Sequence, residues 1–365
     1  MKFLEFQKYQ DYEVIISDNY TNQSLSCKSY CDQSNIRNLK YIKPDRDLSV
    51  IENWNYASEH TTGDYVAFFT DKMLLLPNTL QIISDVINNK YYDILNWIYD
   101  RYNPDSFDDY FDSGLYISGQ NFFYEGEEYL PGPYDPKEAL QKKATCHKPR
   151  TQLNSSEYTR GKICFGLYSR ELINRIKSIT GSLFHYYTPD YNSMILGLSY
   201  ANNAYEISHS GIVHINTNIS TGGTCSVDDS KTLKSILSMQ DGKKMISKLP
   251  INELYSSINN CVLYEYTNLK KKFSLEYEVD ISKWLVHVIE DLYHKDRAWS
   301  SHEVEKKQKE ILRKFISSNL NTEEKVRYER LTSTKALDRL KYRKKKHEPV
   351  HCDTIYSILN KNSFN

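Results

Sequence analysis

The sequence has no excess of charge of either sign. Its 47 lysine and arginine residues equal its 47 aspartate and glutamate residues, so the formal net charge is zero. Proteins that hold nucleic acid through the phosphate backbone usually carry a strongly basic field. The balanced charge therefore gives no case for a nucleic-acid partner.

Long apolar runs and paired cysteines are also absent. No run approaches the roughly 18–20 residues of a membrane-spanning helix, and the N-terminal residues have no signal-peptide pattern. The seven cysteines are an odd number and contain no Cys-x-x-Cys pair, which argues against a disulfide framework or a zinc ribbon. These absences predict a cytoplasmic protein with ordinary thiols.

Internal repeats and low-complexity tracts are absent as well, and 365 residues suffice for one large domain or two. The 31 tyrosines are an unusual number. Aromatic rings with a polar tip suit surfaces that contact sugars or peptides. A biased composition explains the same number equally well.

Two short apolar runs end on carboxylates. Val14–Ile16 leads to Asp18, and Val66–Phe69 leads to Asp71. Both runs are β-branched or aromatic, as in strands buried on both faces of a parallel sheet. Such sheets bind ligands beyond the carboxyl ends of their strands. Two acids at that edge suggest a nucleotide site or a metal–phosphate site.

Strands and helices alternate along the first two hundred residues, which predicts an α/β fold with a mainly parallel central sheet. The expected strands are Tyr12–Ser17, Leu39–Ile42, Tyr65–Phe69, Asp93–Tyr99, Lys162–Tyr168, Tyr205–Ser208 and Ile212–Ile215. The expected helices are Leu48–His60, a segment after Pro77, Arg170–Ile179 and a segment from Thr188 to about Ala201.

Composition divides the chain near residue 227. Residues 103–160 are rich in Tyr, Phe, Gly, Pro and Asp, and a loop this long in an α/β domain is more often a lid or binding insert than scaffold. Beyond residue 227 the sequence is mostly charged amphipathic helix, as in Ile281–Tyr293 and Glu303–Ile316. We therefore predict an α/β domain over 1–227, with an acceptor or lid insert at 103–160, and a helical C-terminal extension over 228–365.

Three stretches resemble the family 2 glycosyltransferases, which have the nucleotide-sugar-binding GT-A fold. Glu13–Asn22 (EVIISDNYTN) is similar to the family's second strand and the acidic turn after it. Leu48–Pro77 resembles its helix–Gly-Asp-Tyr–strand–metal-motif block and is the most specific of the three. Gly181–Ala201 resembles the segment that supplies the catalytic acid residue. Together they cover roughly residues 1–225.

The sequence departs from the family pattern in two places. The family's first strand, with its Pro-x-Tyr-Asn-type turn, has no counterpart before the helix that ends near Tyr9. The family's metal motif is usually Asp-x-Asp or Asp-Asp-Asp, whereas this chain has Thr70-Asp71-Lys72. One carboxylate remains, and a lysine stands where another acid is common.

The resemblance implies a donor site for a nucleotide diphosphate sugar. Asp71 would bind Mg²⁺ or Mn²⁺ together with the substrate phosphates, and Lys72, turned inward, would supply part of the missing charge neutralisation. Asp18 would accept a hydrogen bond from the base or ribose, and Arg46 and Asn53 would contact the donor. Each of these residues also has a structural alternative. Asp71 and Asp18 could belong to ordinary turns, and Asn53 could form a local hydrogen bond within its helix.

The resemblance also implies an inverting reaction with Asp190 as general base. A positioned carboxylate removes the proton of the acceptor hydroxyl as it attacks. An N-cap role explains Asp190 as well, because Pro-Asp is common before a helix. His214 and the glycine-rich turn Ser220–Thr224 follow the last expected strands; His214 is a further candidate metal ligand, although a lone histidine is more often structural.

Two segments suggest how an acceptor is reached. The insert carries aromatic residues that stack on an acceptor sugar or pack as a surface loop: Tyr116, Phe122, Phe123, Tyr124 and Tyr129. The basic segment Lys335–His347 is either a solvated helix or a contact to an anionic membrane surface, worth roughly 1 kcal/mol per basic residue. The second option predicts peripheral membrane association at the inner face.

The sequence therefore predicts a transferase of polysaccharide biosynthesis. It would move a sugar from a nucleotide diphosphate sugar to a hydroxyl of a surface glycan or glycolipid. The alternative is a non-catalytic sugar- or nucleotide-binding protein that kept the fold. A nucleotidyltransferase is disfavoured because its glycine-rich, basic phosphate loop is missing.

Overall fold

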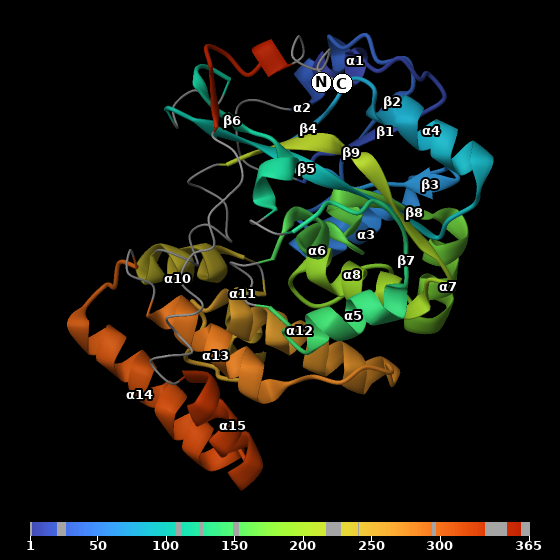
Figure 1. Ribbon diagram of the computed structural model, residues 1–365. Coiled ribbons are helices and arrows are strands. Elements are labelled where there is room, and N and C mark those ends of the chain that lie inside the picture. The colour runs from blue at the N-terminus through green and yellow to red at the C-terminus, as the bar shows by residue number, and fades with distance from the viewer. Residues whose placement is uncertain are drawn as a thin grey trace. The chain divides into compact units, whose positions relative to one another are not determined.

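The computed structural model describes residues 2–19, 27–106, 111–123, 127–148, 153–216, 228–239, 241–293, 297–332 and 349–358. The chain forms two compact units (Figure 1). We call the first the sheet unit; it comprises Met1–Ala139, Asn154–Thr217 and Lys344–Asn365. We call the second the helical unit; it comprises Leu140–Leu153 and Asn218–Arg343.

Two long parallel strands, β5 (Ile94–Pro104) and β9 (Ala204–Ile215), form the centre of the sheet unit (Figure 1). Ile94, Leu95, Trp97 and Ile98 of β5 are fully buried. The two strands predicted at 205–208 and 212–215 are parts of the single strand β9. An irregularity opposite Asn96–Ile98 leaves the middle of β9 polar and exposed, which splits its apolar pattern in the sequence.

The other pairings in this sheet are antiparallel. Strands β6 (Gly114–Ile117) and β8 (Gly166–Ser169) pair with β5, and β4 (Met73–Leu75) and β7 (Gly132–Tyr134) pair with β9. The α/β class is confirmed, but the sheet is mixed where we expected a mainly parallel one. A short apolar run indicates burial on both faces, and it does not indicate strand direction.

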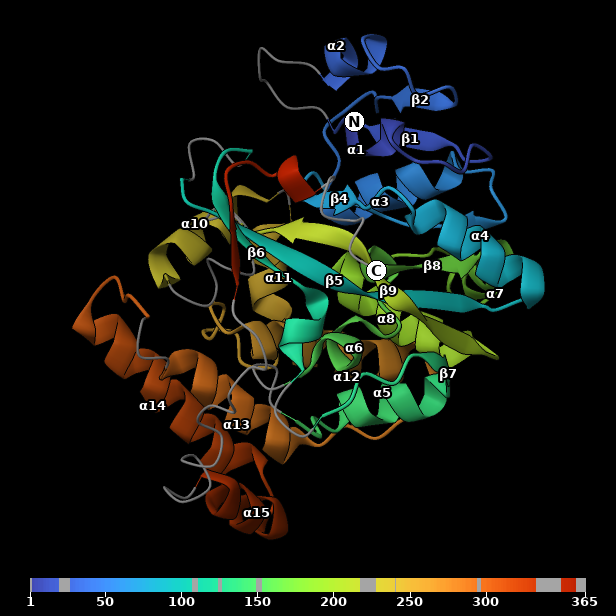
Figure 2. The same cartoon turned by 45° about the horizontal axis from the view of Figure 1, so that its top comes forward.

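A separate parallel pair, β1 (Val14–Ser17) and β2 (Leu39–Ile42), confirms the first two predicted strands (Figure 2). Helix α3 (Val50–Glu59) follows, and it begins with a capping box between Ser49 and Glu52. Such a box satisfies two backbone N–H groups at the start of a helix. The local sequence therefore fixes where α3 begins.

The strand expected before Asp71 is shorter than predicted. Strand β3 is only Tyr65–Val66 and pairs with β8. Phe68 leaves the sheet and stacks on Trp54 of α3 at 5.3 Å between ring centroids. Phe68 is thus buried against α3 and does not extend β3. Asp71 lies in the turn that leads into β4.

The remaining helices of the sheet unit are α1 (Lys2–Glu5), α2 (Cys27–Asp32), α4 (Thr79–Asn89), α6 (Ser155–Thr159), α7 (Arg170–Thr180) and α8 (Pro189–Tyr200), with the 3-10 turns η1 (Gly119–Phe122) and η3 (Ile163–Phe165). Among these helices, α4, α7 and α8 lie at the predicted positions, α1 ends before Tyr9, and α2 and α6 were not predicted. The strand predicted over 162–168 begins only at Gly166, because η3 occupies its first half. Helix α5 (Pro136–Ala144) contains the boundary between the units.

The segment 103–160 contains more regular structure than its composition suggested. It contributes β6 and β7 to the sheet, and most of the aromatic residues proposed for an acceptor are engaged in packing. The Tyr116 hydroxyl donates to Asp100 at 2.5 Å, Phe122 and Phe123 are buried, and Tyr129 donates to the Ile207 carbonyl at 2.6 Å. These contacts favour the packed alternative; Tyr124 lies outside the described residues.

The helical unit confirms the helices expected beyond residue 227. Its described helices are α10 (Asp229–Ser238), α11 (Gly242–Lys248), α12 (Ile258–Phe273), α13 (Ile281–Leu292), α14 (His302–Asn319) and α15 (Thr322–Thr332). Leu285, Val288 and Leu312 belong to its apolar core. No helix among the described residues is long and apolar enough to cross a membrane.

Two segments lie in a different unit from the one expected. Strand β10 (Val350–Cys352) pairs with β6, and Ile355 and Ile358 join a core cluster with Tyr102 of β5. This end of the chain therefore belongs to the sheet unit and not to the helical extension. Residues 140–153 belong to the helical unit, where the Trp284 indole donates to the Ala144 carbonyl at 2.8 Å.

Candidate functional site

The end of β1 is tied to helix α3. The Ser17 hydroxyl donates to Asn53 Oδ1 at 2.7 Å, and the next residue, Asp18, accepts a hydrogen bond from the Tyr41 hydroxyl at 2.7 Å. The side chain of Asn19 bonds the backbone of Leu48 instead of closing a turn with Asp18. Asp18 and Asn53 therefore both lie at the end of β1. Asp18 does not form the local turn with Asn19 that was the alternative explanation.

Asp18 and Asp71 act on the same thiol. Partial desolvation raises the pKa of the thiol of Cys27, a residue that is exposed overall, and the negative charges of Asp18 and then Asp71 raise this pKa further. Nearby anions disfavour a thiolate in this way only at short range. The two carboxylates, 53 positions apart in the sequence, therefore lie within electrostatic reach of one side chain in the sheet unit.

Arg46 lies apart from this group. Its guanidinium is exposed and forms an ion pair with Glu52 at 2.6 Å. This pair holds the pKa of Glu52 down to about 2, helped by the backbone of Ser49. The structure does not bring Arg46 into contact with Asp18 or Asp71.

The turn that carries Asp71 and Lys72 meets the end of β9. Met73 pairs with His214, and the Ile215 amide donates to the Lys72 carbonyl at 2.8 Å. Burial lowers the pKa of His214 to about 4, and the positive charges of Arg101 and Lys72 contribute to this decrease. The His214 ring is therefore neutral at neutral pH, with two cations close to it.

The residues present fit a metal ion only if a substrate shares it. Among the described residues no three His, Cys, Asp or Glu side chains cluster as a cage would require. Asp71 is an exposed carboxylate, and His214 is an uncharged imidazole at neutral pH, with one ring nitrogen able to bind a metal ion. Magnesium is commonly held by one or two carboxylates together with substrate phosphates. Asp71, with His214 as a second candidate, suits that arrangement.

Asp190 lies inside the first turn of α8. The N-cap of this helix is Thr188, and Pro189 occupies the first helical position. The carboxylate of Asp190 instead accepts a hydrogen bond at Oδ2 from the ammonium of Lys162 at 3.3 Å. The capping explanation of Asp190 is therefore not what the structure shows, and its side chain stays 34% exposed.

Helix α3 also holds the segment that leads to Asp190. The Asn55 side chain donates to the Phe184 carbonyl at 2.9 Å and accepts from the Phe184 amide at 3.0 Å. The Phe184 ring packs edge-on against Trp54 at 5.1 Å between centroids. One helix thus carries Asn53, which touches the end of β1, and Asn55, which anchors the approach to α8.

A run of aromatic contacts connects the Lys72 turn with Asp190. The ring centroids of His214 and Tyr99 are 6.2 Å apart, and those of Tyr99 and Tyr158 are 5.9 Å apart. The Lys162 ammonium then lies 3.9 Å from the Tyr158 ring centroid. These side chains come from β9, β5 and α6 and end at the lysine that contacts Asp190.

Sequence reasoning missed Lys162, Tyr99, Tyr158 and Arg101. The Arg101 guanidinium lies 4.5 Å from the Phe122 ring centroid and donates to the Tyr99 hydroxyl at 3.1 Å. These residues belong to no motif, since only the fold brings them together. One signal was available for Lys162, which begins an apolar run in the sequence. A lysine in such a run is expected to be buried, and a buried lysine nearly always has a charged partner.

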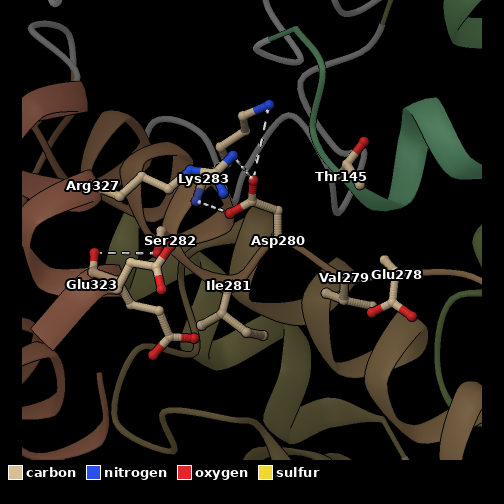
Figure 3. A pocket seen from close by; sticks show the side chains of 10 residues that line it. Thr145, Glu278, Val279, Asp280, Ile281, Ser282, Lys283, Glu323 and Arg327 are labelled. Carbon is tan, nitrogen blue, oxygen red and sulfur yellow. Dashed lines mark hydrogen bonds and ion pairs between the residues drawn. The ribbon is translucent and has the colours of Figure 1, made fainter. Parts of the chain in front are cut away.

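A cavity in the helical unit contains none of the predicted site residues (Figure 3). It measures about 470 Å³ and is lined mainly by polar and charged residues: Thr145, Glu278, Val279, Asp280, Ile281, Ser282, Lys283, Glu323, Glu324 and Arg327. Asp280 pairs with Arg327 at 2.5 Å and with Lys283 at 3.9 Å. Two further predictions, Ser220–Thr224 and Lys335–His347, lie outside the described residues.

Comparison with known proteins identifies the class of the sheet unit. Residues 3–145 match the profile of the family described as glycosyl transferase family 2. The protein is a glycosyltransferase, and the matched segment is a family 2 glycosyltransferase domain, as the resemblance predicted. No curated protein sequence matches the chain.

Solved structures of S. aureus TarS are similar to this chain at low identity. TarS 1–349 is 14% identical with a TM-score of 0.41, over 80% of this chain and 75% of that one. Its complex with UDP-GlcNAc is 13% identical with a TM-score of 0.41, over 80% and 76%. Another TarS structure is 12% identical with a TM-score of 0.40, over 90% of this chain and 51% of that one.

Proposed function

We propose that the protein is an inverting transferase that moves a sugar from a nucleotide diphosphate sugar to a hydroxyl of a surface glycan or glycolipid. One observation carries this proposal above the others. Helix α3 contacts both the strand end that bears Asp18, through Asn53, and the segment that leads to Asp190, through Asn55. The strand end before the proposed donor-binding acid and the segment before the proposed general base are thereby held by one helix.

The donor half of the proposed site consists of Asp18, Asn53, Asp71 and Lys72. Arg46, which is exposed and pairs with Glu52, is a further candidate for a donor contact. Asp18 accepts a hydrogen bond from the ribose or base, and Lys72 neutralises charge on the diphosphate. A bound Mg²⁺ or Mn²⁺ on Asp71, with His214 as a second ligand, would supply further neutralisation of that charge.

The acceptor half is built around Asp190. Its carboxylate takes the proton of the acceptor hydroxyl while the hydroxyl oxygen attacks the anomeric carbon. The bond to the diphosphate breaks on the opposite side, so the configuration at that carbon inverts. The partial exposure of Asp190 supports this role, because an acceptor must be able to reach the carboxylate.

The proposed acceptor determines where the enzyme works. For a lipid-linked glycan of polysaccharide biosynthesis, we propose a cytoplasmic enzyme that contacts the inner face of the membrane peripherally. The locally basic sequence Lys335–His347 supports this part of the proposal. Vesicles with and without anionic lipid, sedimented with the full-length protein, test it: equal binding to both would contradict it.

The function is tested with a panel of nucleotide sugars, with and without Mn²⁺. We expect one donor to raise the melting temperature by mass action and to be hydrolysed slowly without acceptor and transferred with it. Nuclear magnetic resonance of the product then shows whether the anomeric configuration has inverted. Absence of any bound donor would contradict the proposal, and binding without turnover would support a non-catalytic binding protein.

A further inference from the structure

The candidate base has a buried cation beside it. The side chain of Lys162 is only 1% exposed, and its Nζ lies 3.3 Å from Asp190 Oδ2. Lysine is almost never buried to this degree unless it is paired. Asp190 is the carboxylate that forms an ion pair with it.

Two aromatic rings fix the position of this ammonium. Nζ lies 3.9 Å from the ring centroid of Tyr158 and 4.0 Å from that of Tyr191, the residue after Asp190. A cation over a tyrosine face is attracted by the ring, and more strongly where water is excluded. The rings and the carboxylate thus surround the ammonium and leave it little freedom to move.

The backbone around Lys162 is also fixed. Asn96 of β5, which is fully buried, donates to the Lys162 carbonyl at 3.2 Å and accepts from the Gly161 amide at 2.8 Å. Gly161 has a φ of +82°, and a Cβ there would lie 2.5 Å from Leu198 Cγ. This turn therefore requires glycine, and the central strand β5 determines where Lys162 stands.

Lys162 keeps its charge at neutral pH. Burial opposes the charged form, but Tyr158, Tyr191 and Asp190 outweigh this effect, so the pKa of Lys162 is raised. Two further titratable groups, Cys164 and Tyr99, lie within its electrostatic reach, and burial raises the pKa of each. Lys162 is therefore a proton-bearing cation and not itself the base.

We propose that Lys162 is a positioning residue for the transfer reaction: it holds Oδ2 of Asp190, so that Oδ1 receives the proton of the acceptor hydroxyl. This inference rests on the proposed function, in which Asp190 is the base. The acceptor oxygen forms the new bond to the anomeric carbon, its proton goes to Oδ1, and the diphosphate leaves with the electron pair of the broken bond. Lys162 donates no proton in this step.

The central experiment is Lys162→Met, which keeps the length of the side chain and removes its charge. We expect kcat to fall about 10–100-fold, a part of what general-base catalysis contributes, while KM for the donor stays within about twofold. The loss should therefore lie in kcat and not in KM, as expected for a residue that positions the base. Lys162→Arg, which keeps the charge, should restore most of the lost kcat.

Arg175→Met is the matched control for loss of an ion pair. Arg175 pairs with the buried Asp93 at 3.1 Å in the same unit, away from the proposed chemistry. This variant should lower the melting temperature and leave kcat within about twofold of wild type. A fall in kcat as large as in Lys162→Met would mean that the fall reports stability alone and would overturn the inference.

A second comparison uses Asp190→Asn as background. If Lys162 acts through Asp190, adding Lys162→Met to Asp190→Asn should cost no further kcat. Losses that multiply would overturn the inference. Should Lys162→Met fail to fold, the same cycle is run with Lys162→Gln, which also removes the charge; a kcat within twofold of wild type would then overturn the inference.

The outcome also separates this inference from the proposed function. A wild-type enzyme that turns over no nucleotide sugar contradicts the proposed function. An active wild type, with kcat unchanged in Lys162→Met, contradicts the role of Lys162 alone.

Discussion

Asp190 and Asp71 were predicted from the same resemblance, yet the structure gives them opposite surroundings. Asp190 faces a buried ammonium held between Tyr158 and Tyr191. Asp71 is exposed in the turn before β4. The carboxylate that would take the proton is therefore held by the protein, whereas the carboxylate that would bind a metal ion is exposed.

This difference follows from the chemistry of each half. A base must stand within hydrogen-bond reach of one proton, so a rotating carboxylate would lose rate. A diphosphate brings its own charge and, where needed, its own metal ion, so the protein can leave part of that site open. Four predictions break or sharpen this comparison, in order of decreasing effect.

Asp190→Asn should have the largest effect. The amide cannot accept the acceptor proton, so kcat should fall by about 10²–10⁴ with a nearly unchanged donor KM. The melting temperature should also fall, because the buried Lys162 loses its charged partner. Steady-state kinetics at several pH values measure this. Turnover equal to that of the wild type would remove Asp190 from the mechanism and, with it, the contrast between the two halves.

Phe184→Ala should destabilise the segment that leads to Asp190. The ring is 1% exposed and packs on Trp54 and Phe68, so its loss should lower the free energy of unfolding by about 3–5 kcal/mol. Chemical denaturation measures the change. Ile179→Ala, at an exposed position of α7, is the control and should change stability by about 0.5 kcal/mol at most. Equal effects would show that the aromatic cluster is not what fixes this segment.

Lys72→Met should act on the donor half of the proposed site. Loss of one charge-assisted contact of about 1.5–3 kcal/mol should raise the donor KM roughly tenfold or more without changing stability. Lys90→Met, at an exposed lysine after α4, should leave KM unchanged. Turnover with and without Mn²⁺ tests the charge argument: a strict Mn²⁺ requirement that Lys72→Asp abolishes would contradict it.

Glu52→Gln should have the smallest effect. The pKa of Glu52 is lowered to about 2, chiefly by Arg46 and then by Ser49, from an ordinary value of 4.5. The stability that this pair contributes is therefore complete above pH 4.5 and is lost as the pH falls toward 2. Glutamine keeps the capping box but not the charge, so unfolding curves between pH 2 and 5 should slope less. An unchanged slope would place the acid sensitivity elsewhere.

The sequence predicted the elements whose signals are local. The apolar runs located β1 and β2, and the helical spacing located α3, α7 and α13, because burial periodicity and caps are written into neighbouring residues. The resemblance located Asp18, Asp71 and Asp190 by their positions after strands or before a helix. Their proposed roles remain to be tested by the variants above.

Only the tertiary structure decided the mixed direction of the sheet, the return of β10 to β6, and the neighbours of Asp190. Strand direction depends on where distant segments meet, and a short apolar run carries no record of it. Lys162 and Tyr158 stand in no motif, and they meet Tyr99 of β5 only when the segment of α6 and η3 packs on that strand. The sequence determined which side chains can do chemistry; packing determined which of them meet, since a contact between remote residues depends on every segment folded between them.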